Sequence, residues 1–219
     1  MTANTWTVDR AVEALRAAES DRAARRPITE DWPGLGAAYQ VQSELVAARV
    51  AEGERIIGVK LGLTSRAKQW RMGVAAPLTG WLTDGLLLDT GAPVPVERLI
   101  HPRVEPEIVF TLGRRLEDPG VTPASAMAAV RSVSAGLEVI DSRYRDFRFT
   151  LADVVADGRQ SPRAHAAEPR RVRRRRIAII HVTPGSSFAG PTVLGGRTGE
   201  APTPHLEAFC HSVRSAAEF

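Results

Sequence analysis

The stretch His101–Phe110, HPRVEPEIVF, decides how the middle of the chain folds. Its β-branched and aromatic residues favour a β-strand. Glu105 and Glu107 lie two positions apart in it, and side chains two apart on a strand share one face. Two carboxylates on one face of an apolar strand repel each other and lose hydration. The stretch therefore predicts a strand that needs something to hold two like charges together.

A bound cation is one way to compensate these charges. Carboxylate oxygens with open coordination positions suit Mg²⁺ or Mn²⁺, and a third oxygen ligand is usual. Glu138, in the apolar segment GLEVIDSR, supplies such a ligand. The alternative is a solvated sheet face that carries Glu105 and Glu107, and spacing alone favours this alternative because exposed strands often carry acids.

Three further polar residues are candidates for a site. Lys60 lies in GVKLGLTS between apolar residues, where a lysine is usually paired, although it can also point to solvent from a half-exposed strand. Arg143, in DSRYRDF, either clamps a substrate carboxylate or pairs with Asp141 or Asp146. His101 is a candidate ligand or proton carrier, with a structural role as the more common alternative.

The composition narrows the class of protein. The chain has 219 residues, 43% of them hydrophobic, and no apolar run of about eighteen residues that would span a membrane. The first residues lack the pattern of a signal peptide. Cys210 is the only cysteine, which excludes intramolecular disulfides and cysteine-rich metal sites and fits the reducing cytoplasm.

Charge is divided unevenly along the chain. Residues 1–157 hold 19 basic and 21 acidic residues, whereas residues 158–219 hold 10 and 4, including six arginines in Arg170–Arg176. The basic character therefore belongs to the C-terminal part. Nothing in residues 1–157 resembles a nucleic-acid-binding module.

Hydrophobic periodicity predicts an α+β fold. We expect helices over residues 8–26, closed by Pro27, and 36–51, and a short helix over 123–133. Strands are expected over 55–65, 103–113 and 135–144, with a turn-rich segment over 80–100. We divide the chain into an N-terminal helical region (1–56), a β-rich region with the candidate metal ligands (57–157) and an atypical tail (158–219).

Three blocks in their order and spacing resemble the fumarylacetoacetate hydrolase superfamily, over about residues 8–157: GVKLGLTS, LIHPRVEPEIVF and LEVIDSRYRDFRFTLADVVAD. The resemblance implies N-terminal helices followed by a mixed β-sandwich or roll. It implies that Glu105, Glu107 and Glu138 hold Mg²⁺ or Mn²⁺ and that Lys60 is the active-site lysine.

Within that superfamily the chain is most similar to the branch of 2-keto-4-pentenoate hydratases and 4-oxalocrotonate decarboxylases. Hydratases of this branch carry an Asp where this chain has Leu78, and tend to have Gln in place of His101. We therefore favour a lyase that decarboxylates 2-oxo-3-hexenedioate to 2-hydroxypenta-2,4-dienoate in aromatic meta-cleavage catabolism, with the hydratase as the alternative. The implied partners are a small 2-oxo dicarboxylate substrate and a second copy or a related hydratase, but no membrane.

Residues 158–219 do not match the superfamily. Their Arg, Gly and Pro content is typical of a GC-rich gene read out of frame, so we hypothesise a frameshifted or remodelled end and a sheet left incomplete at the C-terminus. Activity would then be lost. A different class of function is an inactive remnant whose Arg170–Arg176 run binds nucleic acid or anionic surfaces. A solvated, disordered run is the more common reading, so nucleic-acid binding is not expected.

Overall fold

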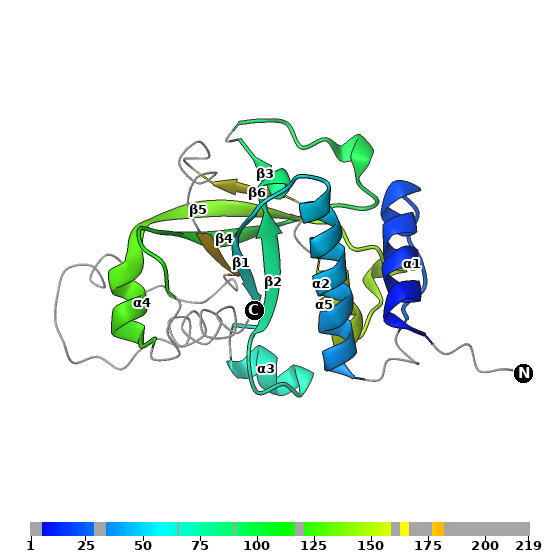
Figure 1. Cartoon of the computed structure of the whole chain (residues 1–219), viewed down its shortest axis with the longest axis horizontal. Helices are drawn as coiled ribbons and strands as arrows, with labels where there is room; N and C mark the ends of the chain where they lie inside the picture. The colour runs from blue at the N-terminus through cyan, green and yellow to red at the C-terminus, as the bar shows by residue number, and fades with distance from the viewer. Residues whose placement is uncertain are drawn as a thin grey trace, which may run out of the picture.

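The computed structural model describes residues 6–28, 34–64, 66–89, 91–116 and 121–158, together with two strands over 163–166 and 177–181. The Arg170–Arg176 run and Cys210 lie outside the described residues. All helices and strands named below lie in these segments, which are coloured from blue at the N-terminus to orange at the last strand in Figure 1.

A seven-stranded mixed sheet forms the centre of the molecule (Figure 1). Its order is β2-β1-β7-β4-β5-β6-β3. The pairs β1–β7 and β3–β6 are parallel, and the other neighbours are antiparallel. The strands are β1 (Ile56–Gly62), β2 (Leu78–Thr83), β3 (Leu87–Leu88), β4 (Arg103–Leu112), β5 (Val130–Ile140), β6 (Arg163–Ala166) and β7 (Ile177–His181).

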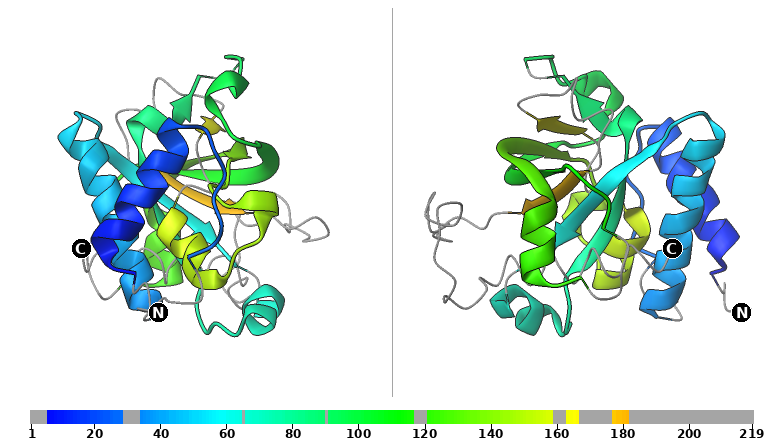
Figure 2. Two further views of the ribbon diagram at one scale, coloured as in Figure 1. Left: turned by 90° about the vertical axis from the view of Figure 1, so that its right-hand side faces the viewer. Right: turned by 60° about the vertical axis from the view of Figure 1, so that its left-hand side comes forward.

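Three helices form a layer beside β2, as the two views of Figure 2 show: α1 (Val8–Ser20), α2 (Leu35–Ala51) and α5 (Leu151–Asp157). Their shared core includes the fully buried side chains of Leu15, Val41 and Tyr144. The short helix α3 (Arg66–Met72) follows β1, and the short helix α4 (Pro123–Ala129) directly precedes β5. Single 3₁₀ turns cover η2 (Asp84–Leu86), η3 (Val96–Arg98) and η4 (Arg145–Phe147). The predicted α+β class is confirmed.

Helix α1 ends earlier than the sequence predicted. The Thr7 hydroxyl caps its first turn by accepting the Arg10 N–H at 3.3 Å, and Leu15 lies on its buried face. The helix stops at Ser20, and Arg22 adopts a positive φ of 51°. The prediction that Pro27 closes this helix is therefore wrong, because the chain has already turned away before the proline.

Helix α4 is also shorter than predicted, because the chain becomes a strand at Val130. A capping box between Thr122 and Ser125 starts the helix. Val130 and Val133 are β-branched and lie opposite β4, with Val133 paired to Phe110. Cross-strand pairing thus overrides the helical spacing of this segment, and β5 begins five residues before the predicted strand.

Two segments after residue 158 belong to the sheet. β7 pairs on one side with β1, where Lys60 faces Ile179, and on the other with β4, where Val109 faces the same residue. β6 pairs with β5 and β3. Part of the segment that the sequence analysis set apart as an atypical tail thus supplies two strands of the sheet. Residues 177–181 match no family pattern, although IAIIH has the composition of a buried strand.

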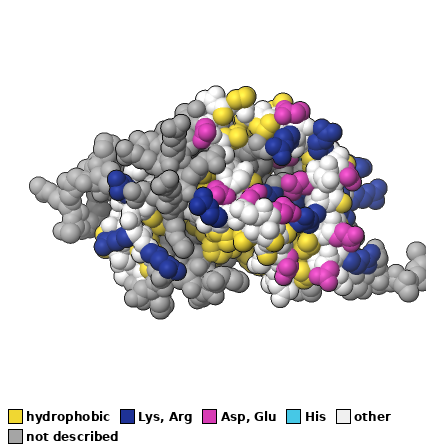
Figure 3. Space-filling model, turned by 45° about the horizontal axis from the view of Figure 1, so that its top comes forward, with side chains coloured by type: hydrophobic (Ala, Val, Ile, Leu, Met, Phe, Trp, Pro, Cys, Tyr) yellow, Lys and Arg dark blue, Asp and Glu magenta, His cyan; other side chains and the backbone are white. Residues whose placement is uncertain are grey.

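The surface of the helical layer carries charges of both signs. On the face shown in Figure 3, acidic and basic side chains alternate over the right-hand side of the molecule. This agrees with the near balance of charges in residues 1–157. Among the described helices, none has the length and apolar content needed to cross a bilayer.

The central place of β7 predicts slow exchange of its amide protons. Ile179 lies between two strands, so its backbone groups are covered on both sides. We expect residues 177–181 to exchange as slowly as β4 in a hydrogen–deuterium exchange experiment read by mass spectrometry. Exchange of the 177–181 peptide at the rate of an unstructured peptide would contradict this placement.

Candidate metal centre and active site

Three carboxylates meet on one face of the β4–β5 pair. Glu105 lies directly opposite Glu138, and Glu107 lies opposite Gly136. Opposite residues of an antiparallel pair point to the same face, so all three acids face the same way. One oxygen from each carboxylate lies within 4.8 Å of the other two. Glu107 and Glu138 are each only 4% exposed, and Glu105 is partly buried.

Lys60 reaches this cluster from β1. Its Nζ lies 2.5 Å from Oε1 of Glu138, with the side chains 15% and 5% exposed. When all three carboxylates are ionised, the acids and Lys60 together carry a net charge of −2. Like charges this close in a poorly hydrated site repel by several kcal/mol, roughly as expected for an effective dielectric constant near 20. A divalent cation is the species that neutralises the remainder, and carboxylate oxygens are ligands that Mg²⁺ and Mn²⁺ accept.

A cavity of about 240 Å³ opens beside the cluster. Lys60, Glu105 and Glu138 line one part of it, and Leu78 lines another. This volume is slightly below the range of about 300–1,000 Å³ that is usual for ligand pockets, and it suits a small molecule. The other apolar side chains of the wall are Leu61, Leu63, Met72, Ile140, Phe149, Leu151, Val154 and Val155. The cavity therefore joins a charged end to a largely apolar wall.

Gln42, which the sequence analysis missed, ties the cavity wall together. It is 3% exposed, and its Nε2 donates to the carbonyl oxygens of Val155 at 2.8 Å and Thr79 at 3.3 Å. These bonds hold α5 and β2 against α2. The signal was a glutamine at a helical position between Ala38 and Leu45, in the apolar stripe of α2.

Tyr39, on α2, also contacts the backbone of β2. Its hydroxyl accepts the Thr79 N–H at 3.4 Å. Burial raises the pKa of the Tyr39 phenol, although the bond from Thr79 acts in the opposite direction. Tyr39 is therefore a neutral hydroxyl at physiological pH, and it positions the strand without adding charge to the site.

His101 lies apart from the carboxylate cluster. Its backbone N–H donates to Asp141 Oδ1 at 2.8 Å, and its ring lies 4.6 Å from that of Phe147. Its Nε2 is buried and has no hydrogen-bond partner among the described residues. His101 lines neither of the two cavities described here. The structure thus brings together Lys60, Leu78 and the three glutamates, but not His101.

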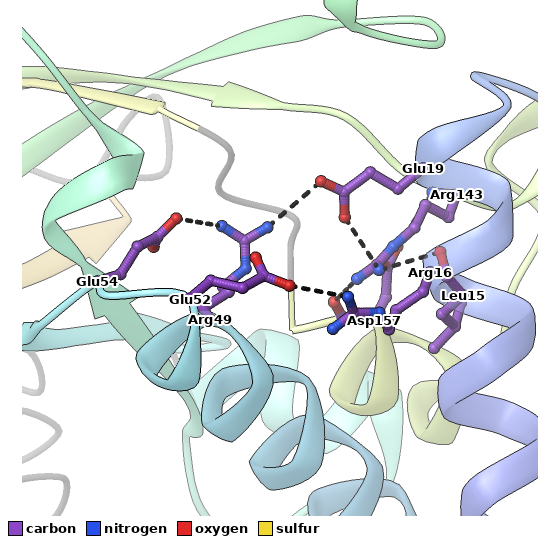
Figure 4. Close-up of polar contacts among 8 residues, drawn as sticks. All are labelled: Leu15, Arg16, Glu19, Arg49, Glu52, Glu54, Arg143 and Asp157. Atoms are coloured by element: carbon purple, nitrogen blue, oxygen red, sulfur yellow. Dashed lines mark hydrogen bonds and ion pairs between the residues drawn. The ribbon is translucent and has the colours of Figure 1, made fainter.

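Arg143 points toward Asp157 and the backbone of α1, as Figure 4 shows. It is 2% exposed and donates to Asp157 through its backbone N–H at 3.1 Å and its Nε at 2.5 Å. It also donates to the carbonyl oxygens of Asp157 and Leu15. Asp157 is its partner, whereas the sequence had offered Asp141 or Asp146. These contacts join α1 to the end of α5.

The residues around Arg143 line a second, larger cavity of about 750 Å³ between α1, α2 and β2. Arg49 binds Glu19 at 3.4 Å and Glu54 at 3.3 Å there, and Arg16 binds Glu52 at 2.8 Å (Figure 4). The guanidinium groups of this cavity are thus each engaged by acids. The smaller cavity is the one that adjoins the carboxylate cluster.

Comparison with known proteins gives relatives of two kinds, some named as decarboxylases and others as hydratases. A 4-oxalocrotonate decarboxylase of Pseudomonas sp. is 44% identical over 145 residues, which are 66% of this chain and 56% of the relative. A 2-hydroxypent-2,4-dienoate hydratase of Pseudomonas putida is 44% identical over 121 residues, 55% of this chain and 54% of the relative. The chain spans little more than half the length of these curated relatives. No family model matches it.

Among solved structures, the 4-oxalocrotonate decarboxylase from Pseudomonas putida G7 complexed with magnesium and adipate superposes with a TM-score of 0.66 at 35% sequence identity. The match covers 75% of this chain and 65% of that chain. A second structure of that enzyme, with calcium and acetate, also has a TM-score of 0.66. The similarity that the three sequence blocks predicted is therefore confirmed.

The cluster predicts that the protein binds Mg²⁺ through Glu138. Replacing Glu138→Gln removes one anionic ligand while keeping the shape of the side chain, and also leaves Lys60 without its carboxylate partner. We expect Mg²⁺ affinity, measured by isothermal titration calorimetry, to fall at least about tenfold. Glu52→Gln, which changes an exposed acid in the ion pair with Arg16, should leave it unchanged. Equal affinities for the two variants would contradict the site.

The Arg143–Asp157 pair predicts a large effect on stability. Arg143→Met leaves the Asp157 carboxylate buried without its cation, and we expect a loss of about 3–5 kcal/mol in the free energy of unfolding, measured with urea. The exposed Arg16→Met, which breaks only the pair with Glu52, should change it by less than about 0.5 kcal/mol. The double variant Arg143→Met/Asp157→Leu should recover part of the loss. A loss below about 1 kcal/mol for Arg143→Met would refute the structural role.

Proposed function

This chain is a relative, over about two thirds of its length, of the 4-oxalocrotonate decarboxylases and 2-keto-4-pentenoate hydratases of the fumarylacetoacetate hydrolase superfamily, and from that premise we propose that it is a Mg²⁺-dependent lyase. The preferred reaction is decarboxylation of 2-oxo-3-hexenedioate to 2-hydroxypenta-2,4-dienoate. Because the chain spans little more than half of the curated relatives, its activity, substrate and partners are all part of the proposal.

The observation that carries the proposal is the junction of a carboxylate cluster with an apolar wall. Glu105, Glu107 and Glu138 offer oxygens within 4.8 Å of one another, and the cavity beside them contains Lys60 and Leu78. The solved relative is complexed with magnesium and adipate, a six-carbon dicarboxylate. The proposed substrate is also a six-carbon dicarboxylate, with a ketone beside one carboxylate.

The three glutamates would hold Mg²⁺ (or Mn²⁺) in this site. The ion would supply Lewis acidity toward the ketone oxygen and the neighbouring carboxylate. The glutamates position that charge, and their mutual repulsion disfavours the site without a cation. Lys60, already 2.5 Å from Glu138, adds positive charge where the substrate's anionic oxygens would lie.

The reaction breaks the bond between the far carboxylate carbon and its neighbour. The carboxylate leaves as CO₂, and its bonding electrons pass through the conjugated chain to the ketone oxygen, which takes up a proton to give the 2-hydroxy diene acid. The apolar wall near Leu78 favours this step, because a carboxylate loses its charge there and a poorly hydrated anion is destabilised relative to neutral CO₂. His101 and Arg143, which lie away from the cluster, enter the proposal only as residues that shape the surrounding loops.

Hydration of 2-hydroxypenta-2,4-dienoate is the second candidate. It is favoured by relatives named hydratases at 38–44% identity, which match 55–68% of this chain. Water addition needs a polar group to handle protons, and Leu78 supplies none. For this reason we place decarboxylation first.

The proposal includes finer points of the sequence interpretation. These are a mixed sandwich or roll that is incomplete at the C-terminus, a division at residues 57 and 158, a homo-oligomer or a complex with a related hydratase, a location in the cytoplasm, and loss of activity through the altered C-terminus. The third class of function, a remnant that binds anions through Arg170–Arg176, falls on residues outside those described.

Assays with both substrates test the prediction that the protein acts as a decarboxylase because position 78 is a leucine. With Mg²⁺, the protein should release CO₂ from 2-oxo-3-hexenedioate and hydrate 2-hydroxypenta-2,4-dienoate poorly, as followed by CO₂ detection and ultraviolet absorbance. Leu78→Asp places a negative charge about 4–6 Å from the leaving carboxylate of the bound substrate, where repulsion amounts to about 3 kcal/mol, so the KM for 2-oxo-3-hexenedioate should rise about 100-fold.

Leu78→Asn is the matched control, because it adds polarity of the same shape without the charge. We expect a smaller rise of KM for Leu78→Asn than for Leu78→Asp. Efficient hydration by the unmutated protein without CO₂ release would overturn the decarboxylase and establish the hydratase in its place. No reaction with either substrate, despite Mg²⁺ binding, would support loss of activity.

A further inference from the structure

Gly80, in the middle of β2, faces Lys60 across the strand pair. The two residues are Cα partners in the antiparallel β1–β2 ladder. Directly opposite residues point to the same face, so any side chain at position 80 would stand beside the stem of Lys60. Both residues line the smaller cavity.

A Cβ at position 80 would collide with the lysine stem. It would lie 2.9 Å from Cγ and 3.2 Å from Cδ of Lys60, whereas the nearest other atom, the Gly158 carbonyl oxygen, is 3.6 Å away. Carbon atoms in normal contact are about 3.5–4.0 Å apart. The position is thus closed to a side chain chiefly by Lys60.

The backbone does not explain this glycine. Gly80 is absent from the described glycines with positive φ, so an L-residue can adopt its conformation. Gly62, in the same ladder, differs: a Cβ there would meet only Leu78 Cβ at 3.8 Å, an ordinary contact. What distinguishes position 80 is therefore the space that it leaves for its cross-strand neighbour.

The course of the lysine stem matters because its target lies far across the sheet. β1 and β5 are separated by β7 and β4, yet Nζ of Lys60 comes within 2.5 Å of Glu138 on β5. With its Cγ and Cδ lying over Gly80, the stem takes a course that ends at the carboxylate cluster. Lys60 is only 15% exposed along its side chain, so few alternative courses exist.

We propose that Gly80 is a positioning residue for Lys60: the absence of a side chain at position 80 lets the lysine stem lie over β2 and holds its ammonium at the carboxylate cluster. The role of Lys60 in a reaction rests on the proposed function, but the positioning itself does not.

The first test is a double-mutant cycle on the metal-free protein. Gly80→Ala should lower the melting temperature by about 3–10 °C, as overpacking does in a chain of this size. In the Lys60→Ala background, which removes Cγ and Cδ, the same substitution should have no destabilising effect. In the Lys60→Met background, which retains a stem without a charge, the loss should return. Gly62→Ala, the matched control, should be tolerated in all three backgrounds.

The second test observes the ammonium end of the side chain. The chain contains only two lysines, Lys60 and Lys68. Protein labelled with ¹³C at lysine Cε should therefore give two signals, and Lys60→Met assigns them. Gly80→Ala should shift the Lys60 signal and leave the Lys68 signal in place, whereas Gly62→Ala should shift neither.

These outcomes decide the proposal independently of catalysis. A loss of stability from Gly80→Ala that is the same with and without the Lys60 stem would overturn it, as would an unchanged Lys60 signal. If the coupling is found but the protein neither binds Mg²⁺ nor turns over either substrate, the positioning stands and the proposed function fails. If Mg²⁺ binds and 2-oxo-3-hexenedioate is decarboxylated but the coupling is absent, the proposed function stands and the positioning fails.

Discussion

Repulsion among three carboxylates is the constraint on which the rest of this structure depends. β4 and β5 could pair in many registers, but the observed one places Glu105 opposite Glu138 and brings Glu107 alongside. Such an arrangement is unfavourable unless a cation shares it. Lys60, on β1, compensates one charge. The sheet is therefore arranged around a cluster that destabilises it in the absence of positive charge.

The helical layer solves a separate problem of buried charge. Arg143 and Asp157 are both almost completely buried, and each satisfies the other in a short, multiply bonded pair. Because Arg143 also reaches Leu15, the pair connects α1, the loop after β5 and the end of α5. Val155, near the end of that same helix, lines the cavity beside the carboxylates. The fixed position of α5 thus determines one wall of the candidate site.

Much of the candidate site could be predicted from the sequence because its residues lie in segments with a clear strand pattern. Alternation places Glu105 and Glu107 on one face, the apolar segments around Glu138 and Lys60 made both of them candidates, and the resemblance gave all four their roles. Residues whose role depends on distant partners were missed or assigned differently. Arg143 is identified by its pairing with Asp157, fourteen residues away and on another element. Gln42 gives only the weak signal of a polar residue in an apolar stripe, and Gly80 gives none, since their effect lies in what crosses or faces them in space. The strand at 177–181 was missed because the arginine-rich composition around it concealed a short apolar run.

The place of β7 in the sheet has a consequence for biosynthesis. β1 and β2 carry Lys60, Gly80 and Leu78, whereas β4 and β5 carry the glutamates, and in the described sheet the two halves are joined through β7. The ribosome releases both halves before the strand that joins them. Until β7 arrives, β1 and β4 each present an open edge, which is the kind of surface that associates with other chains. Long-range pairing of this type is slow, and the nascent chain must retain both edges unpaired while the arginine-rich segment is translated. Assembly of the candidate site therefore comes late in the synthesis of the polypeptide, after the arginine-rich segment has been translated.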